Sequence, residues 1–300
     1  MRVTLARPPS TRGRPRGERA LPYLLVLPTL VLIGALALLP LLYGVWLSFG
    51  RWDLLSGQGL RVGTLENYAR LLQDSDFWRA FVRTLWWTLG TVAFQVIVGL
   101  GLALLLNRPT FVAEKVSALI LLPWVTPFVV IVYAWLLLLD GSGGVTGRVL
   151  AALNLPPLSP LASPLSAFVT VTLISGWKGT PFMVIALLAA LKSIPAELYE
   201  AARVDGATPG QALRFVTLPL LRNTLVVTGL ILGILAFYNF DLPWLMTAGG
   251  PGEATTLIGV AIYQTFFIDV QPTYAAAMGT VMLLVLLVLA LLSLRLRRAT

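Results

Sequence analysis

The stretch that decides the fold is Glu200-Ala201-Ala202-Arg203-Val204-Asp205-Gly206, which runs on to Val216-Thr217-Leu218-Pro219. It is a polar island between two long apolar segments, 165–191 and 219–240. The pattern predicts a short helix over 195–204, because proline suits the start of a helix and acidic side chains near its N-terminus are stabilised by the helix dipole. Asp205-Gly206 predicts a turn, since glycine accepts backbone angles that are closed to other residues.

A second short helix is expected after this turn. Thr208 is its expected N-cap, Pro209 its first residue and Phe215 its approximate end. Residues 192–218 would then form a helix-turn-helix knob with small residues at its tip, which permits close approach to a partner. The simple alternative is a solvated connecting loop, because a chain that crosses a membrane repeatedly needs polar loops and Asp-Gly is an ordinary turn.

The composition indicates a membrane protein. The chain has 300 residues, of which 57% are hydrophobic and only 12% charged, and its mean hydropathy is +0.85. Soluble domains carry about 25% charged residues. A membrane-spanning helix needs about 20 apolar residues, and six segments meet this demand: 21–49, 81–106, 116–139, 165–191, 219–240 and 273–294. The sequence therefore predicts an all-α polytopic protein with six transmembrane helices.

The distribution of basic residues predicts the orientation. With the N-terminus inside, the inner segments hold fifteen of the 22 Lys and Arg residues and the outer segments six, while Lys178 lies within a span. Because Lys and Arg collect on the cytoplasmic side, residues 1–20 and 295–300 are expected to be cytoplasmic tails. Residues 21–294 would form the transmembrane domain, and the knob within it would also lie in the cytoplasm. The net charge of +9 is thus a topology signal, and no nucleic-acid partner is expected.

Several smaller features complete this organisation. Prolines inside the spans, such as Pro127 and Pro181, are expected to kink the helices rather than break them, because neighbouring helices can satisfy the freed carbonyl groups. Residues 65–80 have helical spacing and are expected to lie along the outer membrane surface, where they contact lipid. The apolar segment 257–268 is too short to span and predicts an interfacial or re-entrant helix.

The chain has little to support catalysis or metal binding. It contains no cysteine and no histidine, so the commonest general base and the commonest metal ligand are both missing. A phosphate-cradling loop would need Gly-Lys-Ser/Thr, but the only Lys followed by Ser or Thr is Lys192, which Leu191 precedes. We expect no catalytic site, no metal and no cofactor, with ATP bound elsewhere. An ion-coupled secondary transporter is the alternative, although such proteins place acidic residues within their helices.

The stretch from Glu200 to Pro219 resembles the EAA loop of binding-protein-dependent ABC importer permeases. The matching residues are Glu200, Ala201, Ala202, Gly206, Leu218 and Pro219, with Val216 where that family usually has isoleucine. The resemblance implies a type I importer fold in which this loop couples the channel to a separate ATPase. It implies coupling roles for Glu200, Ala201, Ala202, Asp205, Gly206, Leu218 and Pro219.

Other motifs extend the resemblance over nearly the whole chain after the tail. They are Leu27-Pro28, Leu39-Pro40, Glu66-Asn67-Tyr68, Asp76-Phe77-Trp78, Trp177 to Pro181-Phe182, and Thr247-Ala248-Gly249-Gly250-Pro251. The family commonly has glycine where this chain has Ala248. They look like the carbohydrate branch of the importers. The resemblance implies a second, related permease, a cytoplasmic ATPase dimer, an external solute-binding protein and a sugar or polyol as solute, in the cytoplasmic membrane of a prokaryote.

Two polar groups are candidates for the solute pathway. Trp177 and Lys178 lie well inside a predicted span, where a charge is costly and should face water or a partner. Alternatively, Lys178 pairs structurally or snorkels. Tyr238, Asn239 and Asp241 follow the fifth span, where they could bind sugar hydroxyls and faces or form an interfacial belt.

Overall fold

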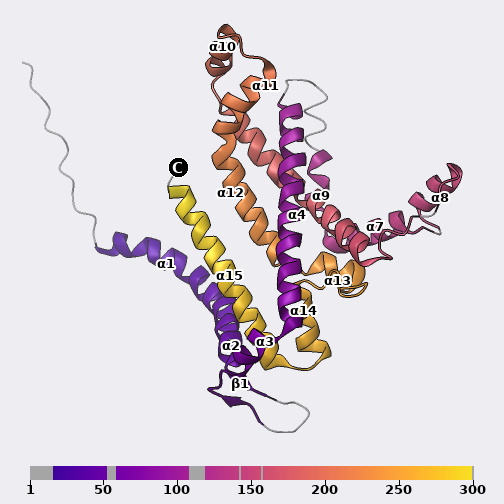
Figure 1. Ribbon diagram of the computed structural model, residues 1–300. Helices are drawn as coiled ribbons and strands as arrows, with labels where there is room; N and C mark the ends of the chain where they lie inside the picture. Colours follow the sequence, from indigo (N-terminus) through magenta and orange to yellow (C-terminus); the bar gives the residue numbers. More distant parts are fainter. Residues whose placement is uncertain (1–15, 53–58, 108–118, 142, 157, 299–300) are drawn as a thin grey trace, which may run out of the picture.

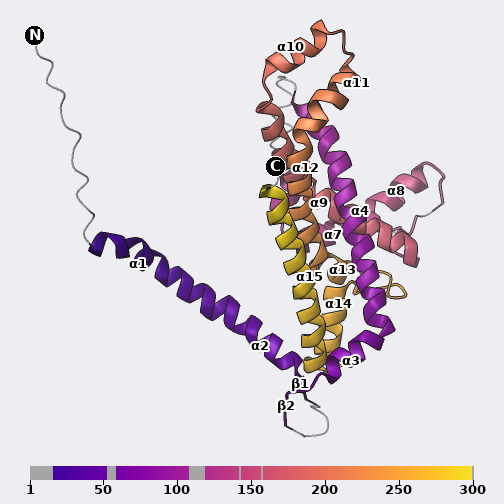
Figure 2. The ribbon, with the colours of Figure 1, turned by 60° about the vertical axis from the view of Figure 1, so that its left-hand side comes forward.

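Four long helices run side by side and form a bundle (Figure 1): α4 (Ser75–Leu106), α9 (Pro164–Lys192), α12 (Leu218–Phe237) and α15 (Pro272–Arg298). The computed structural model describes residues 16–52, 59–107, 119–141, 143–156 and 158–298. A further rod is made by α1 (Arg16–Ile33), a π-helical turn η1 (Gly34–Leu38) and α2 (Leu39–Ser48). Figure 2 shows that α2 lies against the end of α15, whereas α1 points away from the bundle.

The shorter elements lie at the two ends and on one side of the bundle. They are β1 (Gly50–Arg51), β2 (Arg61–Val62), α3 (Glu66–Gln73), α6 (Leu122–Val125), α7 (Phe128–Leu139), α8 (Val145–Ala152), α10 (Ala196–Val204), α11 (Pro209–Ala212), the π turn η2 (Leu213–Thr217), α13 (Asp241–Thr247), α14 (Ile258–Tyr263) and the π turn η3 (Gln264–Ile268). The two-residue strands pair antiparallel, with Gly50 opposite Val62. Helices α10 and α11 lie at the end opposite to β1 and α3 (Figure 1).

Close contact between α4 and α9 forms the centre of the bundle. Gly99 lets the two helices approach, because a Cβ atom there would lie 2.6 Å from Met183 Cγ. Small residues permit this approach in membrane bundles, where van der Waals packing drives association. Trp87 of α4 is fully buried, and its indole Nε1 donates a hydrogen bond to the carbonyl oxygen of Ala236 at 3.2 Å. This bond ties α4 to the end of α12.

The structure confirms the all-α prediction. Among the described residues, five helices are long and apolar enough to cross a membrane: Leu24–Ser48, Ser75–Leu106, Pro164–Lys192, Pro209–Phe237 and Pro272–Arg295. The predicted boundaries shift at several places. Helix α1 begins inside the expected 1–20 tail and α15 extends through the expected tail as far as Arg298, since arginine is a good helix former. Residues 1–15 and 299–300 lie outside the described residues.

The predicted third span, 116–139, is broken rather than kinked. Helix α6 ends at Val125, Thr126 adopts an extended conformation (ψ 131°), and α7 starts at Phe128. Proline has no N–H and disfavours a helical conformation for the residue before it, which explains the break before Pro127. By contrast, α9 continues through Pro181 as expected. Residues 116–118 lie outside the described residues.

Two Leu-Pro pairs follow π turns. In η1 the N–H of Leu39 bonds to the carbonyl of Gly34, and in η2 the N–H of Leu218 bonds to that of Leu213. The wider turn relieves the clash that a proline ring makes with the preceding turn of an α-helix. The expectation that the second knob helix ends near Phe215 is therefore wrong, because the chain passes through η2 into α12 without interruption.

The outer segments also differ in part from expectation. Residues 65–80 form two helices rather than one, because the Asp74 side chain accepts hydrogen bonds from the N–H groups of Asp76 and Phe77 and so caps a new helix, α4. The second span thus begins at Ser75 instead of Phe81. The segment 257–268 is short, as expected, and Ile258 is fully buried where α14 packs against α4 and α15.

Candidate functional site

The knob predicted at 192–218 is built by two well-capped helices. Helix α10 ends in a glycine-dependent cap, in which Gly206 N–H donates to the Arg203 carbonyl (3.0 Å) and Ala207 N–H to the Ala202 carbonyl (2.9 Å). Gly206 has φ +79°, the left-handed conformation that this cap requires and glycine adopts most readily. The turn at Asp205-Gly206 is therefore where the sequence places it.

Thr208 caps α11, as the sequence predicts. Its hydroxyl accepts from Gln211 N–H (3.4 Å) while the Gln211 side chain accepts from Thr208 N–H (2.7 Å), which satisfies two helix-end donors reciprocally. The Tyr199 hydroxyl of α10 lies 3.1 Å from the Thr217 hydroxyl at the base of α12. The knob is thus fastened to the fifth span rather than attached by a loose connector.

The surface of the knob exposes apolar side chains together with the expected polar ones. Glu200, Ala201 and Asp205 are exposed, and Ala202 is half-buried. Val204 is 87% exposed and Phe215 67% exposed. Leu218 and Pro219 lie at the start of α12 instead of at the tip. Sequence analysis missed Phe215 as a surface residue, although its place beside Arg214 at the polar end of a span was an available signal.

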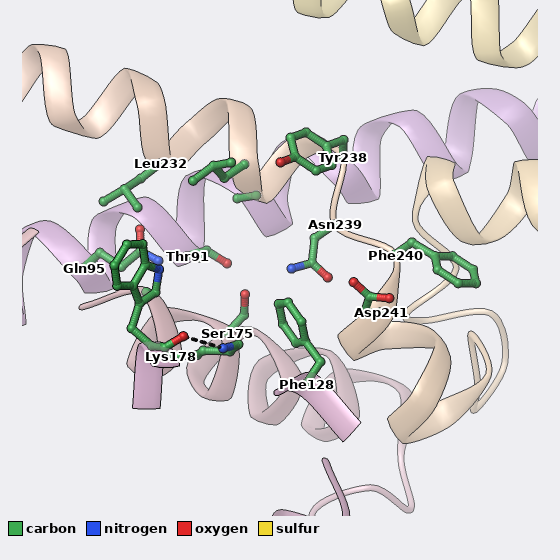
Figure 3. A pocket seen from close by; sticks show the side chains of 14 residues that line it. Thr91, Gln95, Phe128, Ser175, Lys178, Leu232, Tyr238, Asn239, Phe240 and Asp241 are labelled. Carbon is green, nitrogen blue, oxygen red and sulfur yellow. Dashed lines mark hydrogen bonds between the residues drawn. The ribbon is translucent and has the colours of Figure 1, made fainter. Parts of the chain in front are cut away.

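A cavity of about 610 Å³ lies among α4, α6, α7, α9 and the junction of α12 with α13. Its lining includes Thr91, Gln95, Trp124, Phe128, Ser175, Lys178, Gly179, Leu232, Leu235, Ala236, Tyr238, Asn239, Phe240 and Asp241. The structure thus brings together four of the five residues predicted for the solute pathway: Lys178, Tyr238, Asn239 and Asp241 (Figure 3).

Trp177 does not join them. Its ring packs edge-on against Trp135, with 5.5 Å between centroids, and it lines a separate groove with Phe94 and Leu173. Neighbouring residues on an α-helix point about 100° apart, and here this rotation turns Trp177 away from the cavity that Lys178 and Gly179 line. The prediction that placed Trp177 beside Lys178 in one pathway, because the two are neighbours in the sequence, therefore does not match the structure.

Lys178 lines the cavity and is also held by its own chain. Its ammonium group donates to the carbonyl oxygens of Thr126 (3.0 Å), Pro123 (3.2 Å) and Trp124 (3.4 Å). It also lies 4.4 Å from the centre of the Phe128 ring, within range of a cation–π interaction. The side chain is 8% exposed. Structural pairing and a position in the cavity wall, which the sequence offered as alternatives, occur together.

The polar face of α4 was missed by the sequence analysis. Among the described residues, Thr88 Oγ1, Thr91 Oγ1 and Gln95 Oε1 are buried without a hydrogen-bond partner, and the last two belong to residues that line the cavity. Gly179 makes room for Gln95, because a Cβ atom at Gly179 would lie 2.1 Å from Gln95 Nε2. The spacing Thr91–Gln95 within an apolar span places both on one helix face and was the signal that could have revealed them.

The other end of the cavity is formed where α12 passes into α13. Asn239 Oδ1 accepts from the N–H of Leu242 in the first turn of α13 (3.4 Å). Tyr238 is 47% exposed, and Asp241 is exposed as well. Amide, carboxylate and hydroxyl groups next to aromatic rings can bind a polyhydroxylated solute, since the rings can cover its apolar faces.

Comparison with known proteins identifies the family to which this architecture belongs. The family described as "Binding-protein-dependent transport system inner membrane component" matches residues 95–299. The chain belongs to this family. The permease is 35% identical over 249 residues to the trehalose/maltose transport system permease protein MalF of Thermococcus litoralis, a match that covers 83% of this chain and 84% of that protein.

Other relatives place the permease in the carbohydrate branch of the ABC importers. It is 36% identical over 276 residues to the sulfoquinovosyl glycerol transport system permease protein SmoG of Agrobacterium fabrum, a match that covers 91% of this chain and 88% of that protein. The fold matches a bacterial ABC transporter involved in the import of the acidic polysaccharide alginate, with a TM-score of 0.80, 27% identity and coverage of 94% and 97% of the two chains. The permease is a multi-pass membrane protein for transport and not an enzyme.

Proposed function

We propose that this permease forms one half of a sugar or polyol pathway, together with a second, related permease. The 610 Å³ cavity would be its contribution to the solute route. Relatives from transport systems for trehalose/maltose and sulfoquinovosyl glycerol support a carbohydrate-type solute. The lining of the cavity supports it too, because Asn239, Asp241 and Ser175 offer hydrogen bonds beside the rings of Trp124, Phe128 and Tyr238.

The observation that carries this proposal is the unpaired polar face of α4. A buried polar atom without a partner costs about 1–3 kcal/mol, and native structures rarely keep such atoms without a reason. Thr91 is fully buried and Gln95 is 3% exposed. A change of conformation that opens the cavity towards α4 would give both oxygens solute hydroxyl groups as donors.

The proposed energy source is ATP bound and hydrolysed by a separate ATPase dimer that docks on the knob. Closure of this dimer would move α10 and, through the Tyr199–Thr217 contact, the base of α12. An external binding protein would deliver solute, and the pathway would alternate between outward and inward access by rigid-body motion. This arrangement requires both termini and the knob to be cytoplasmic, in agreement with the excess of basic residues in the inner segments.

The test uses the assembled transporter in proteoliposomes loaded with ATP. Uptake of maltose, trehalose and sulfoquinovosyl glycerol would be measured with the binding protein outside. Gln95→Leu and Thr91→Val should reduce uptake of whichever sugar is carried, while Thr280→Val is the matched control because its hydroxyl bonds within α15 (Ala276 carbonyl, 2.8 Å). Uptake that persists without ATP and stops with a protonophore would contradict the proposal and indicate a secondary transporter.

A further inference from the structure

The break between α6 and α7 leaves carbonyl groups without their usual helical donors. In a continuous helix, the N–H of residue 127 would bond to the carbonyl of residue 123, but residue 127 is proline and has no N–H. The extended conformation of Thr126 removes the following donors as well. The carbonyl oxygens of Pro123, Trp124 and Thr126 therefore need donors from another element.

Lys178 supplies these donors from α9. A lysine ammonium has three N–H groups, and three carbonyl oxygens lie within 3.0–3.4 Å of Lys178 Nζ. The dashed line in Figure 3 marks the hydrogen bond that the Lys178 ammonium group donates to the Trp124 carbonyl oxygen. All three partners are neutral carbonyls, so the ammonium serves as a clamp on the broken helix instead of as one half of an ion pair with them.

The two halves of the broken helix pack on different parts of the molecule. On the α6 side, Trp124 packs its ring against Phe182 of α9 (5.5 Å between centroids), and Ile120 packs against the cluster of Leu106 and Val184. On the α7 side, Ile131 and Val132 are buried in a cluster that contains Leu242 and Met246 of α13 and also Val171 and Ile174 of α9. Helix α6 thus packs on the part of α9 after Lys178, and α7 packs on α13 and on the part of α9 before Lys178, while Lys178 contacts both halves through its hydrogen bonds and the Phe128 ring.

We propose that Lys178 is a positioning residue that fastens α6 to the C-terminal half of α9, so that α6 moves with this half and the knob while α7 hinges at Thr126-Pro127. Helix α9 leads directly into α10, and this inference therefore rests on the proposed ATPase coupling through the knob. Trp124 of α6 and Phe128 of α7 both line the cavity. Relative motion at the hinge would reshape the cavity wall each time the ATPase closes.

Distances between spin labels test the clamp. The chain contains no cysteine, so two introduced cysteines carry the only labels on this subunit, provided that any cysteines of the partner subunits are replaced. One pair is Leu122→Cys with Ile185→Cys, which joins α6 to α9; the other is Leu137→Cys with Ile185→Cys, which joins α7 to α9. All three sites are exposed in the chain, at 58%, 45% and 67% respectively for Leu122, Ile185 and Leu137. The assembled transporter is measured without nucleotide and with ATP bound to a hydrolysis-deficient ATPase.

The Leu122–Ile185 distance should stay the same in the two states, while the Leu137–Ile185 distance should shift. Lys178→Met, which keeps the length of the side chain but removes its donors, should broaden the Leu122–Ile185 distribution and abolish stimulation of ATP hydrolysis by the binding protein. Lys178→Arg should restore a narrow distribution, because it keeps the donors.

Two results would overturn the clamp. One is a Leu122–Ile185 distance that shifts as much as the Leu137–Ile185 distance when Lys178 is intact. This measurement does not need the Lys178→Met variant, so it can be made even if that variant fails to assemble. The other is a Lys178→Met transporter with a narrow distribution and normal stimulation. Failure of ATP-driven uptake in the unaltered complex would instead contradict the proposed function, so the two failures are distinguishable.

Discussion

Gly206 shows how a single residue determines the shape of the coupling knob. Its φ of +79° is a conformation that other residues adopt at a cost of about 1 kcal/mol. The space around it is open, because a Cβ atom there would have no neighbour within 4 Å. A side chain at this position would therefore be tolerated by the permease itself but would project from the surface that we propose as the ATPase docking site.

We accordingly expect Gly206→Arg and Glu200→Lys to insert and fold like the unaltered protein, because both positions are exposed and outside the bundle. Co-purification of the ATPase or its stimulated hydrolysis should be lost, and uptake with it. Gly206→Ala is the matched control, since it introduces the backbone strain without the bulk and charge and should cause a smaller loss. Wild-type coupling in all the variants would mean that the knob is only a connector.

Asp74 is a second residue whose chemistry can be tested. Burial acts to raise the pKa of its carboxyl group, but hydrogen bonds from the Tyr274 hydroxyl and from the N–H groups of Phe77 and Asp76, with the charge of Arg70, lower the pKa overall. A lowered pKa in the folded state means that ionised Asp74 stabilises the fold at neutral pH. This contribution is lost as the pH falls below about 4, the ordinary aspartate range.

Thermal unfolding of the detergent-solubilised protein between neutral pH and pH 3 tests this expectation. Asp74→Asn should lower the unfolding temperature at neutral pH and reduce its fall in acid, because the variant has no carboxylate to protonate at that position. Asp76→Asn is the control, as Asp76 is exposed and contacts its helix neighbour Arg79. Identical pH profiles for Asp74→Asn and the unaltered protein would contradict the assignment.

At the scale of elements, two of the described π turns, η1 and η2, share a sequence motif: each is followed by a Leu-Pro pair. Leu39-Pro40 and Leu218-Pro219 each follow a five-residue π turn, and the missing N–H of proline explains why the helix widens there. The turn η2 is the last part of the knob before α12, whereas η1 lies in the first span. A π turn followed by a Leu-Pro pair therefore occurs once at the base of the knob and once far from the knob along the chain.

Pro219→Ala should allow η2 to relax towards an α-helix and turn the knob relative to α12. We expect stimulated ATP hydrolysis to fall while the unfolding temperature stays the same or rises, since alanine is the better helix former. Pro40→Ala offers a matched control and should leave hydrolysis unchanged. Equal effects of the two substitutions would show that the turn beside the knob has no special part in coupling.

The elements also show what a sequence can reveal and what it cannot. Hydrophobic length predicted α4, α9, α12 and α15, because a bilayer-length apolar helix is dictated by local chemistry. Whether a proline breaks its helix depends on distant parts of the chain. Pro181 stays within α9, whereas the helix breaks at Pro127, where Lys178 donates hydrogen bonds to the freed carbonyl groups from at least 52 residues away. Gln95 was missed because its importance depends on contact with Gly179 of another helix.

At the scale of the whole molecule, the arrangement predicts which surfaces face which side of the membrane. The knob and the β1–β2 ribbon lie at opposite ends of the bundle (Figure 1). In intact cells, a cysteine at Ala207 should resist a membrane-impermeant thiol reagent, while a cysteine at Arg61 should react. Both should react after the cells are permeabilised. The reverse pattern would contradict the cytoplasmic position of the knob and the proposed ATPase docking with it.

The turn η2 has a consequence for protein engineering. Each added residue turns a helix by about 100° about its axis. The direction in which the knob points, relative to the side of α12 that faces the cavity, therefore depends on the number of residues in Leu213–Thr217. Deleting one of them would swing the knob around the axis without changing a side chain of its tip or of the cavity. In the proposed mechanism, changing the length of this segment would therefore alter how the ATPase drives α12 without altering the residues that line the cavity.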